Sequence, residues 1–449
     1  MDDRDLLIGP GMVFSGGRVV AGAGVLVRGG RIAAIGPHAR LEESLQAGAA
    51  RLDAGGGLVL PGLINAHTHL YSALARGFPL TGPPPADFTG ILSRLWWRLD
   101  RALTLEDVRV SALLGSMEAV RCGVTTIVDH HASPGACGDS LAAIRAAVET
   151  VGIRAGLCYE VSDRDGPAAA RAGIEENLRF ARELRQAPSP AVAAQFGIHA
   201  LFTVGEETLA RCVDAARGAG LSLHLHLAED EVDVRWNLEH FDERPVQRLA
   251  RHRGLETEAL LAHGTHVDSE EIEILAATKA FVAHNPESNM NNAVGRAPVR
   301  AMGERGVSVG LGTDGMSADM LSAARAAFLL ARHAERDPGA AWRDVPRMLW
   351  TNNARLAARL FGLPVGELSE GAAADVIVLD YDPPTPLDEG NLFAHLVFGL
   401  SSRHVATTVA GGRVLMHERK LLTVDAAELQ ACGRERARAL WKRIEALGS

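Results

Sequence analysis

The sequence has no apolar run near the roughly 18 residues that a membrane span needs. It also has no cluster of basic residues that would suit a nucleic-acid surface, and its net charge of −9 is spread without long runs of either sign. The first residues, MDDRDLLIGPG, carry acidic side chains where a secretory signal carries basic ones. Five widely spaced cysteines without a CxxC pair favour buried free thiols in a reducing compartment. We therefore expect a cytoplasmic protein that binds neither membranes nor nucleic acids, which leaves small-molecule chemistry open.

Both ends of the chain are rich in short, β-branched runs broken by glycine, a pattern typical of hairpins. These runs occupy residues 12–58 and 371–421. Neither segment is long enough to bury a core comfortably by itself. We therefore predict that residues 1–58 and 366–421 meet to form one small β-sandwich domain.

The middle of the chain has a different pattern, in which short apolar strands alternate with longer amphipathic stretches. This alternation is typical of a parallel sheet with crossover helices. The predicted strands are 58–69, 125–131, 153–160, 192–200, 221–229, 259–267, 280–289 and 307–315. Eight such units over about 300 residues favour an α/β fold of the (β/α)₈ type, a TIM barrel, over residues 59–365.

The last residues, 422–449, are predicted to form a helix with one apolar face. That face could pack on the barrel or on another subunit, and the assembly that we expect is a homodimer.

Polar residues cluster where the predicted barrel strands end, which is where the active site of such a barrel lies. The strand-end residues are His67, His69, His224, His226, Glu229, His263, His284, Asn285, Thr313 and Asp314. His67 and His69 are two positions apart, so on a strand both point to the same side. Two converging imidazoles suit a divalent ion of the Zn²⁺ or Fe²⁺ type. An HxH pair alone is weak evidence for a metal, but five such strand ends are hard to ascribe to packing.

Five motifs then make a family resemblance specific: PGLINAHTHL, HLAED, AHGTH, HNPESN and GTDG. In this order and spacing they resemble the amidohydrolase superfamily, and more closely its cytosine deaminase, guanine deaminase and triazine hydrolase branch. WWRLDRAL, VDHHASP and SNMNN further resemble the SsnA group of aminohydrolases within that branch. The resemblance covers nearly the whole chain, including the split β-sandwich. It is highly specific for fold and metal site and much less so for substrate.

The resemblance implies a site with one divalent metal ion, Zn²⁺ or Fe²⁺. Its ligands would be His67, His69, His226 and Asp314. His226 is preferred to His224 because the family motif places its ligand three residues before a catalytic acid, and His224 is then a core or supporting residue. The family's two-metal members carry a carboxylated lysine on the fourth strand. This sequence ends that strand with His199, which favours a single metal.

The same resemblance gives catalytic roles to three residues. Asp314 would also take the proton from the attacking water, Glu229 would shuttle protons, and His263 would polarise the substrate oxygen or orient the nucleophile. The residues themselves leave simpler interpretations open. Glu229 could be a surface residue that opens the next helix, and His263 could be a satisfied core histidine.

Six further residues are candidates for holding the substrate: Arg76, Trp96, His131, His199, Asn285 and Asn289. Two open questions concern neighbouring pairs. His130 and His131 alternate in direction, so at most one should face the site. Asn285, Ser288 and Asn289 are expected in a turn that shapes the pocket.

The connection 71–104 is unusually long and starts directly after His69. Connections of this length are often binding loops or lids. We predict a specificity lid in which Arg76 donates hydrogen bonds to a carbonyl or carboxylate of the substrate. Aromatic residues make up only 5% of the chain, so one of Trp96 and Trp97 is expected to reach the pocket while the other packs.

The implied function is hydrolytic deamination of a nitrogen heterocycle of purine, pterin, pyrimidine or triazine type. One alternative is hydrolytic opening of a cyclic amide in a purine-derived compound, because the same metal and acids would serve. Another is a barrel that keeps its metal without catalysis. The intact set of acids and ligands argues against that last alternative.

Overall fold

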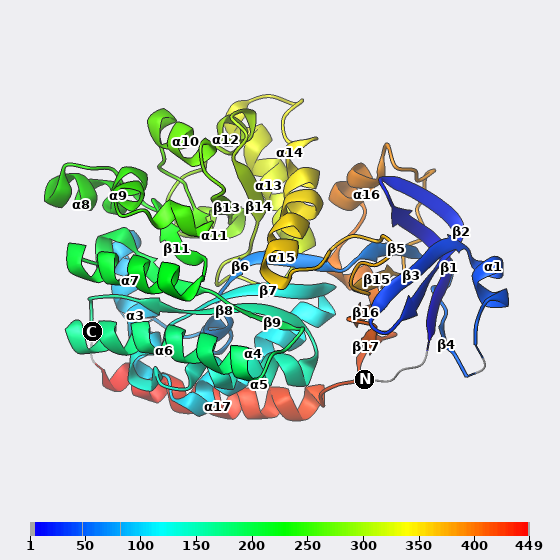
Figure 1. Cartoon of the computed structure of the whole chain (residues 1–449), viewed down its shortest axis with the longest axis horizontal. Coiled ribbons are helices and arrows are strands. Elements are labelled where there is room, and N and C mark those ends of the chain that lie inside the picture. Colours follow the sequence, from blue (N-terminus) through cyan, green and yellow to red (C-terminus); the bar gives the residue numbers. More distant parts are fainter. Residues whose placement is uncertain (1–4, 47, 81, 448–449) are drawn as a thin grey trace.

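The apolar strands of the middle region form a parallel barrel in the computed structural model, which describes residues 5–46, 48–80 and 82–447 (Figure 1). Its strands are β6 (Leu63–Thr68), β7 (Val124–His131), β8 (Arg154–Val161), β9 (Val192–Ala194), β10 (Phe196–Ala200), β11 (Leu223–Leu227), β12 (Leu260–His263), β13 (Phe281–His284) and β14 (Ser308–Leu311). They pair in parallel in chain order, with β9 and β10 together as the fourth strand. The backbone N–H groups of Thr313 and Asp314 donate to the carbonyl of His67 and join the last strand end to the first. The predicted barrel is confirmed.

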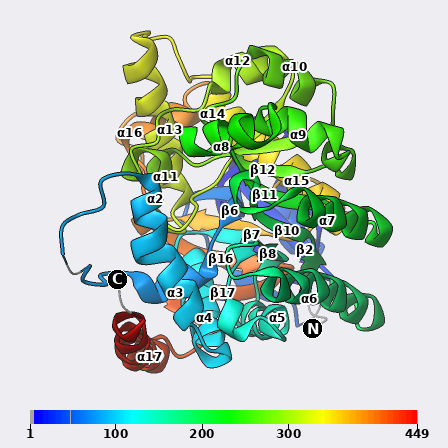
Figure 2. The same cartoon turned by 90° about the vertical axis from the view of Figure 1, so that its left-hand side faces the viewer.

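Amphipathic helices cover the outside of the barrel (Figures 1 and 2). They are α4 (Leu105–Arg121), α5 (Ser140–Val151), α6 (Pro167–Gln186), α7 (Glu206–Ala219), α8 (Glu231–Phe241), α9 (Pro245–Arg251), α10 (Ser269–Ala276), α12 (Val299–Glu304), α13 (Met320–Glu335), α14 (Asp344–Pro346) and α15 (Asn353–Phe361). Short 3₁₀ turns lie at η3 (Pro134–Ala136), η4 (Leu201–Thr203) and η5 (Gly254–Thr257). Helix α4 shows how the sequence sets such bounds: Thr104 and Asp107 form a capping box at its start.

An apolar layer fills one level of the barrel interior. Its residues are Ala66, Val128, Leu260, Phe281, Ala283 and Leu356. They come from β6, β7, β12, β13 and α15, and β7 and β12 are not neighbours in the sheet. Contact between them must therefore cross the barrel axis. This packing supports the strand ends that carry the polar residues.

The two chain ends form a second, nine-stranded sheet. Its strands are β1 (Leu6–Ser15), β2 (Arg18–Arg28), β3 (Arg31–Pro37), β4 (Ala50–Leu52), β5 (Leu58–Pro61), β15 (Val376–Leu379), β16 (Val405–Ala410), β17 (Arg413–His417) and β18 (Lys420–Leu421). Backbone hydrogen bonds between residues 30–32 and 372–374 bring β3 back beside the segment that precedes β15. The sheet thus folds over its own apolar core, as expected for a small sandwich. Helices α1 (His38–Glu43) and α16 (Leu392–Phe398) and the turn η7 (Ser402–His404) lie in this region of the chain.

The predicted strand 58–69 is in fact two strands separated at Gly62. The first, β5, is antiparallel to β15 in the end sheet, and the second, β6, is parallel to β7 in the barrel. A Cβ atom on residue 62 would lie 2.3 Å from the Thr125 Oγ1 atom and 2.5 Å from its Cγ2 atom. Only glycine therefore lets the chain pass so close to β7 as it changes sheets. That contact is long-range and could not be seen in the sequence.

The connection after β6 folds into short helices across the mouth of the barrel. They are the 3₁₀ helix η1 (Leu70–Ala75), α2 (Phe88–Ile91), the π-helix η2 (Leu92–Trp96) and α3 (Trp97–Ala102). A second π-helix, η6 (Arg347–Asn352), precedes α15.

The C-terminal helix α17 (Ala426–Ala446) lies along α3 and α4 (Figure 2). Its Leu440 and Ile444 are fully buried, and the Trp441 Nε1–H donates to the carbonyl of Leu74 at 2.8 Å. The apolar face of α17 is thus used within its own chain. In the described part of the chain, no helix is both long and apolar enough to cross a membrane.

We predict that Gly62→Ala lowers the free energy of unfolding by about 1–3 kcal/mol, the usual cost of overpacking a core. The new methyl group would meet the buried side chain of Thr125. Chemical denaturation followed by circular dichroism measures the change. Adding Thr125→Ala should restore most of the loss, and a double variant no more stable than Gly62→Ala would contradict this account.

Candidate active site

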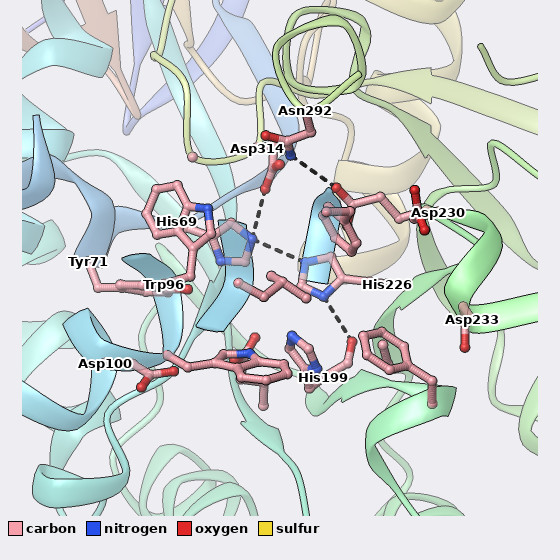
Figure 3. Close-up of a pocket in the computed structure, with 18 residues that line it drawn as sticks. His69, Tyr71, Trp96, Asp100, His199, His226, Asp230, Asp233, Asn292 and Asp314 are labelled. Carbon is pink, nitrogen blue, oxygen red and sulfur yellow. Dashed lines mark hydrogen bonds and ion pairs between the residues drawn. The ribbon is translucent and has the colours of Figure 1, made fainter. Parts of the chain in front are cut away.

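A cavity opens at the carboxyl ends of the barrel strands and encloses about 640 Å³ of space, part of it open to solvent (Figure 3). The residues that line it are His69, Tyr71, Phe88, Leu92, Trp96, Trp97, Asp100, Glu160, His199, Ala200, Phe202, His226, Glu229, Asp230, Asp233, Asn292, Asp314 and Gly315. They come from strand ends and from the connection after β6. This position is where barrel enzymes carry their active sites.

The four ligands expected for a metal come together at this cavity. Ligand atoms of His67, His69, His226 and Asp314 all lie within 4.8 Å of one another. The Asp314 Oδ1 atom is 2.9 Å from the His69 Nε2 atom and 3.4 Å from the His67 Nε2 atom. Three imidazole nitrogens and one carboxylate oxygen form a donor set that zinc accepts.

Backbone carbonyls determine which nitrogen of each ring is free. The Nδ1–H of His69 donates to the carbonyl of His130, and the Nδ1–H of His226 donates to the carbonyl of His199 at 2.8 Å. In the neutral rings both Nε2 atoms are then acceptors, although they lie only 3.1 Å apart (Figure 3). Two acceptors cannot hydrogen-bond to each other, so the pair needs a cation. A metal ion can fill this role, and so can a proton, because the Asp314 carboxylate outweighs the effect of burial and raises the pKa of His69 to about 9.

His67 and His224 share a contact below the site. The His67 Nδ1 atom lies 2.9 Å from the His224 Nε2 atom, and the His67 Nε2 atom has no hydrogen-bond partner among the described residues. Burial lowers the pKa of His67 to about 3, so its ring is neutral and can bind a metal. His224 therefore supports a ligand and does not line the cavity.

Three strand ends turn through the left-handed region of backbone conformation. The φ angles are +43° at Ala228, +74° at His263 and +56° at Asp314. Residues other than glycine rarely adopt such angles, and they persist where the surrounding structure enforces them. Two of the three are residues that the sequence singles out for catalysis. The strained turns place their side chains at the mouth of the barrel.

Glu229 and His263 lie side by side next to the ligands. The Glu229 Oε2 atom is 3.5 Å from the His263 Nε2 atom, and the Asn292 side-chain amide donates to Glu229 Oε1 at 3.2 Å. Burial raises the pKa of Glu229 to about 7, which lets this carboxyl group both give and take protons near neutrality. The Asn289 Oδ1 atom accepts the Nδ1–H of His263 at 2.8 Å and fixes the ring.

The Asp314 carboxylate stays ionised despite its burial. Burial alone would raise its pKa, but the adjacent imidazoles of His67 and His69 outweigh this and hold the pKa well below its usual range. The Ser288 hydroxyl donates to the Asp314 Oδ2 atom. Oδ1 is therefore left to face the three imidazoles.

Four of the six residues expected to hold the substrate do not line the cavity, and Arg76 and His131 are two of them. The side chain of Arg76 is 62% exposed and forms an ion pair with Glu118 of α4 at 2.7 Å, which holds it outside the cavity. His131 is buried against Ser133, with 2.9 Å between its Nε2 atom and the hydroxyl. Its neighbour His130 faces the barrel interior, where its ring centre lies 4.8 Å from that of His226.

The segment expected to be a turn after β13 is the short helix α11 (Pro286–Asn291). Pro286 suits the first position of a helix because its fixed φ is already helical. On this helix Asn289 holds His263, whereas Asn285 is buried, bonds to the carbonyl of Ala283 and does not line the cavity. Asn289 therefore acts through His263, and Asn285 lies behind the site.

The structure brings the other two expected substrate residues, Trp96 and His199, to the cavity. His199 lines it, held by the Thr203 hydroxyl at 2.9 Å from its Nδ1 atom. Trp96 and Trp97 both line it, although only one was expected to reach it. The π-helix η2 ends at Trp96 and α3 begins at Trp97, so the two indoles follow a change of helical turn instead of one regular helix.

Sequence reasoning missed Asp100, Glu160 and Asn292 as cavity residues. Each lies in or beside a stretch already singled out: Asp100 in WWRLDRAL, Glu160 at the end of the strand 153–160, and Asn292 in SNMNN. The position of Glu160 at a strand end was the signal that could have found it. Asp100 and Asn292 reach the cavity only through the fold.

The sequence model of the amidohydrolase family matches residues 58–415 of this chain. Curated relatives align over nearly the full length. A 5-methylthioadenosine/S-adenosylhomocysteine deaminase of Haloarcula marismortui is 35% identical over 446 residues, covering 98% of this chain and 99% of that protein. A protein of the same name from Pelotomaculum thermopropionicum is 32% identical over 439 residues, covering 97% of this chain and 96% of that protein.

Solved structures share the architecture. An adenosine deaminase from Xanthomonas campestris with bound zinc has a TM-score of 0.86 and 25% identity, and the match covers 99% of each chain. An atrazine chlorohydrolase from Arthrobacter aurescens in complex with zinc has a TM-score of 0.79 and 24% identity, with 97% of this chain and 100% of that chain covered. The second likeness shows the fold alone.

The geometry of the two histidines on β11 predicts unequal effects on metal binding. His226→Ala should remove a ligand and abolish stoichiometric metal, whereas His224→Ala should weaken metal affinity about 10–100-fold through the loss of support to His67. Elemental analysis after dialysis against a graded chelator measures both. Metal loss in His224→Ala with retention in His226→Ala would overturn the ligand assignment.

Proposed function

Because the chain belongs to the amidohydrolase family, we propose that it is a metal-dependent aminohydrolase that adds water to a carbon atom of a nitrogen heterocycle and releases ammonia. The observation that carries this function is the convergence of three free Nε2 atoms and the Asp314 carboxylate beside Glu229 and His263. A cavity with aromatic walls adjoins these groups. The chain thus combines a donor set for a metal with two groups able to move protons.

The metal that we propose is one Zn²⁺ ion per chain, held by His67, His69, His226 and Asp314. Such an ion lowers the pKa of a coordinated water from 15.7 to about 7. The fourth strand ends in His199, whose Nδ1 atom is held by Thr203, and offers no lysine to bridge a second ion. The zinc in the similar adenosine deaminase supports the choice of metal.

Asp314 and Glu229 divide the proton transfers. Asp314 is held ionised, and its Oδ2 atom, which accepts from Ser288, keeps a second lone pair that can take a proton from the attacking water. Glu229 is buried and holds a proton close to neutral pH. It can donate that proton to a ring nitrogen, recover one, and pass it to the departing amino group.

His263 is placed to orient the nucleophile. Its Nδ1–H is donated to Asn289, so in the neutral ring the Nε2 atom is an acceptor. That atom has no hydrogen-bond partner among the described residues and lies 3.9 Å from the Asp314 Oδ2 atom. It can accept the O–H of the attacking water and hold its lone pair towards the substrate carbon.

The substrate class that we propose is a purine-type heterocycle, with its nucleosides as the first candidates. Two curated relatives of nearly equal length carry the name 5-methylthioadenosine/S-adenosylhomocysteine deaminase, which supports this class. Aromatic side chains at Phe88, Trp96, Trp97 and Phe202 give a planar ring apolar walls.

We predict that the zinc-loaded protein releases ammonia from at least one member of a panel of aminopurines, adenine nucleosides, aminopterins, aminopyrimidines and aminotriazines. A coupled ammonia assay and the ultraviolet spectrum of the ring are recorded together. Loss of the ring absorbance without ammonia would instead identify ring opening of a cyclic amide. No reaction with any member would contradict the proposed deamination.

Neutralising either acid should separate catalysis from metal binding. Glu229→Gln should lower kcat by about 10²–10⁴-fold with metal content unchanged, because it removes only a proton shuttle. Asp314→Asn should lower both kcat and metal retention, because that carboxylate also faces the imidazoles. Steady-state kinetics and elemental analysis decide between the two patterns. Near-native turnover in Glu229→Gln would show that another group moves the proton.

A further inference from the structure

The cavity is lined by many acidic side chains. Six carboxylates line it: Asp100, Glu160, Glu229, Asp230, Asp233 and Asp314. Among the described lining residues there is no lysine and no arginine. An incoming molecule therefore meets acceptors and negative charge on several sides.

Four of these carboxylates have a role in the reaction centre or in binding backbone N–H groups. Asp314 and Glu229 belong to the reaction centre. Asp230 caps α8 by accepting the N–H of Val232 at 2.9 Å, and Asp233 accepts the N–H of Ala228 at 2.8 Å. Asp100 and Glu160 remain, and they form a separate wall of the cavity.

The two carboxylates of this wall share one arginine. The Arg164 Nη2 atom pairs with the Asp100 Oδ2 atom and lies 3.7 Å from the Glu160 Oε1 atom. Its guanidinium lies 5.4 Å from the ring centre of Trp97. Arg164 does not line the cavity, and its Nη2 atom is the one that serves both carboxylates, whereas its Nε and Nη1 atoms are buried without a hydrogen-bond partner among the described residues.

The second possible cation near the wall is also committed. The His130 Nδ1 atom lies 3.1 Å from the Glu160 Oε2 atom, and its Nε2–H donates to the carbonyl of His224 at 3.1 Å. One arginine and one imidazole face two carboxylates here, so this end of the cavity has no excess positive charge that could bind an anionic ligand.

Two atoms of the wall lack a hydrogen bond to any described residue: the Asp100 Oδ1 atom and the Glu160 Oε2 atom, the second of which still pairs with His130. The Asp100 Oδ1 atom is buried without a hydrogen bond to any described residue, although the side chain is only 1% exposed. A buried carboxylate oxygen without a donor is costly, so such atoms call for an explanation. Asp100 lies in the lid segment beside Tyr71 and Trp96, away from Asp314 and Asn292 (Figure 3). A ligand that reaches from the metal ligands to this wall can supply the missing donor.

Building on the function proposed above, we propose that the Asp100–Glu160 wall selects neutral or cationic heterocycles with N–H or O–H donors and rejects substrates that carry a carboxylate or phosphate. An anionic group would face carboxylate oxygens at short range, where charges are poorly screened. A hydroxyl or ammonium group would satisfy the free Asp100 oxygen. Of the two substrates in the relatives' name, 5-methylthioadenosine has no charged group, whereas S-adenosylhomocysteine carries an ammonium and a carboxylate on one carbon, so its ammonium cannot enter the wall without bringing the carboxylate. The chain should therefore favour the first.

Binding measurements test this selection without relying on turnover. Zinc-loaded protein is titrated by calorimetry with three purine nucleosides that lack the exocyclic amine and differ only at the 5′ position. The groups are methylthio, carboxymethylthio and aminoethylthio. We expect the carboxylate to bind at least about tenfold more weakly than the methylthio compound, a difference of about 1.4 kcal/mol. The ammonium should bind at least as well as the methylthio compound.

Two variants and a matched control show where the selection arises. Asp100→Asn removes one charge of the wall and frees Arg164, so the penalty on the carboxylate should shrink at least about threefold in Kd. Glu160→Gln should act in the same direction and serves if Asp100→Asn fails to fold in a thermal melt. Asp165→Asn is the control, because Asp165 also approaches Arg164, at 3.6 Å, but does not line the cavity. It should leave the ratio of the two Kd values unchanged.

The outcomes separate the two proposals. Equal or tighter binding of the carboxylate, or no binding of any of the three compounds, would overturn the selection, whether or not deamination is found. An unchanged ratio in both wall variants would also overturn it. Selective binding of the neutral and cationic compounds without ammonia release from any heterocycle would leave the selection standing and refute the deaminase function.

Discussion

Two imidazole nitrogens only 3.1 Å apart are the constraint around which this site is built. When both rings are neutral, both nitrogens are acceptors and repel each other, and each ring must carry its proton on the other nitrogen. The carbonyls of His130 and His199 do this by accepting the Nδ1–H groups of His69 and His226. Those carbonyls belong to β7 and to the end of β10, so the tautomers of the ligands depend on the register of strands other than their own. A divalent ion held by these nitrogens would replace the repulsion between them with coordination.

The closure of the barrel and the assembly of the site use the same backbone. The carbonyl of His67 accepts from Thr313 and Asp314 where the last strand meets the first. This contact joins a ligand on β6 to the ligand that follows β14, so a barrel that failed to close would also lose the metal site. The left-handed turns at His263 and Asp314 are a further cost of the same arrangement, and they are tolerated because the neighbouring strand ends leave the chain no other path.

Local patterns predicted the barrel and the ligand set because both depend on short stretches of sequence. The alternation of strands and helices needs only windows of a few residues, and HTH, HLAED and GTD each sit at the end of one strand. What failed depends on contacts between distant residues. Close packing against Thr125 determines the break between strands at Gly62. The ion pair with Glu118, which is 42 residues away, determines the position of Arg76. The orientation of β7, which sets His130 against Glu160, determines which of His130 and His131 faces the barrel interior. None of these has a local signal.

The Asp100–Glu160 wall also depends on contacts between residues that are distant in the sequence. Asp100 comes from α3 in the lid segment and Glu160 from β8, and they become one surface because Arg164 pairs with both. The chemistry of the reaction centre, in contrast, is carried by strand ends whose motifs can be read one at a time. A relative can therefore share every ligand and proton carrier with this chain and still differ in what it admits, because a change at one wall residue alters the charge of the cavity without touching the metal. For that reason the name of a similar enzyme transfers its reaction more safely than its substrate. The charge balance at Asp100, Glu160, Arg164 and His130 is the feature of this chain that decides which molecules reach the metal.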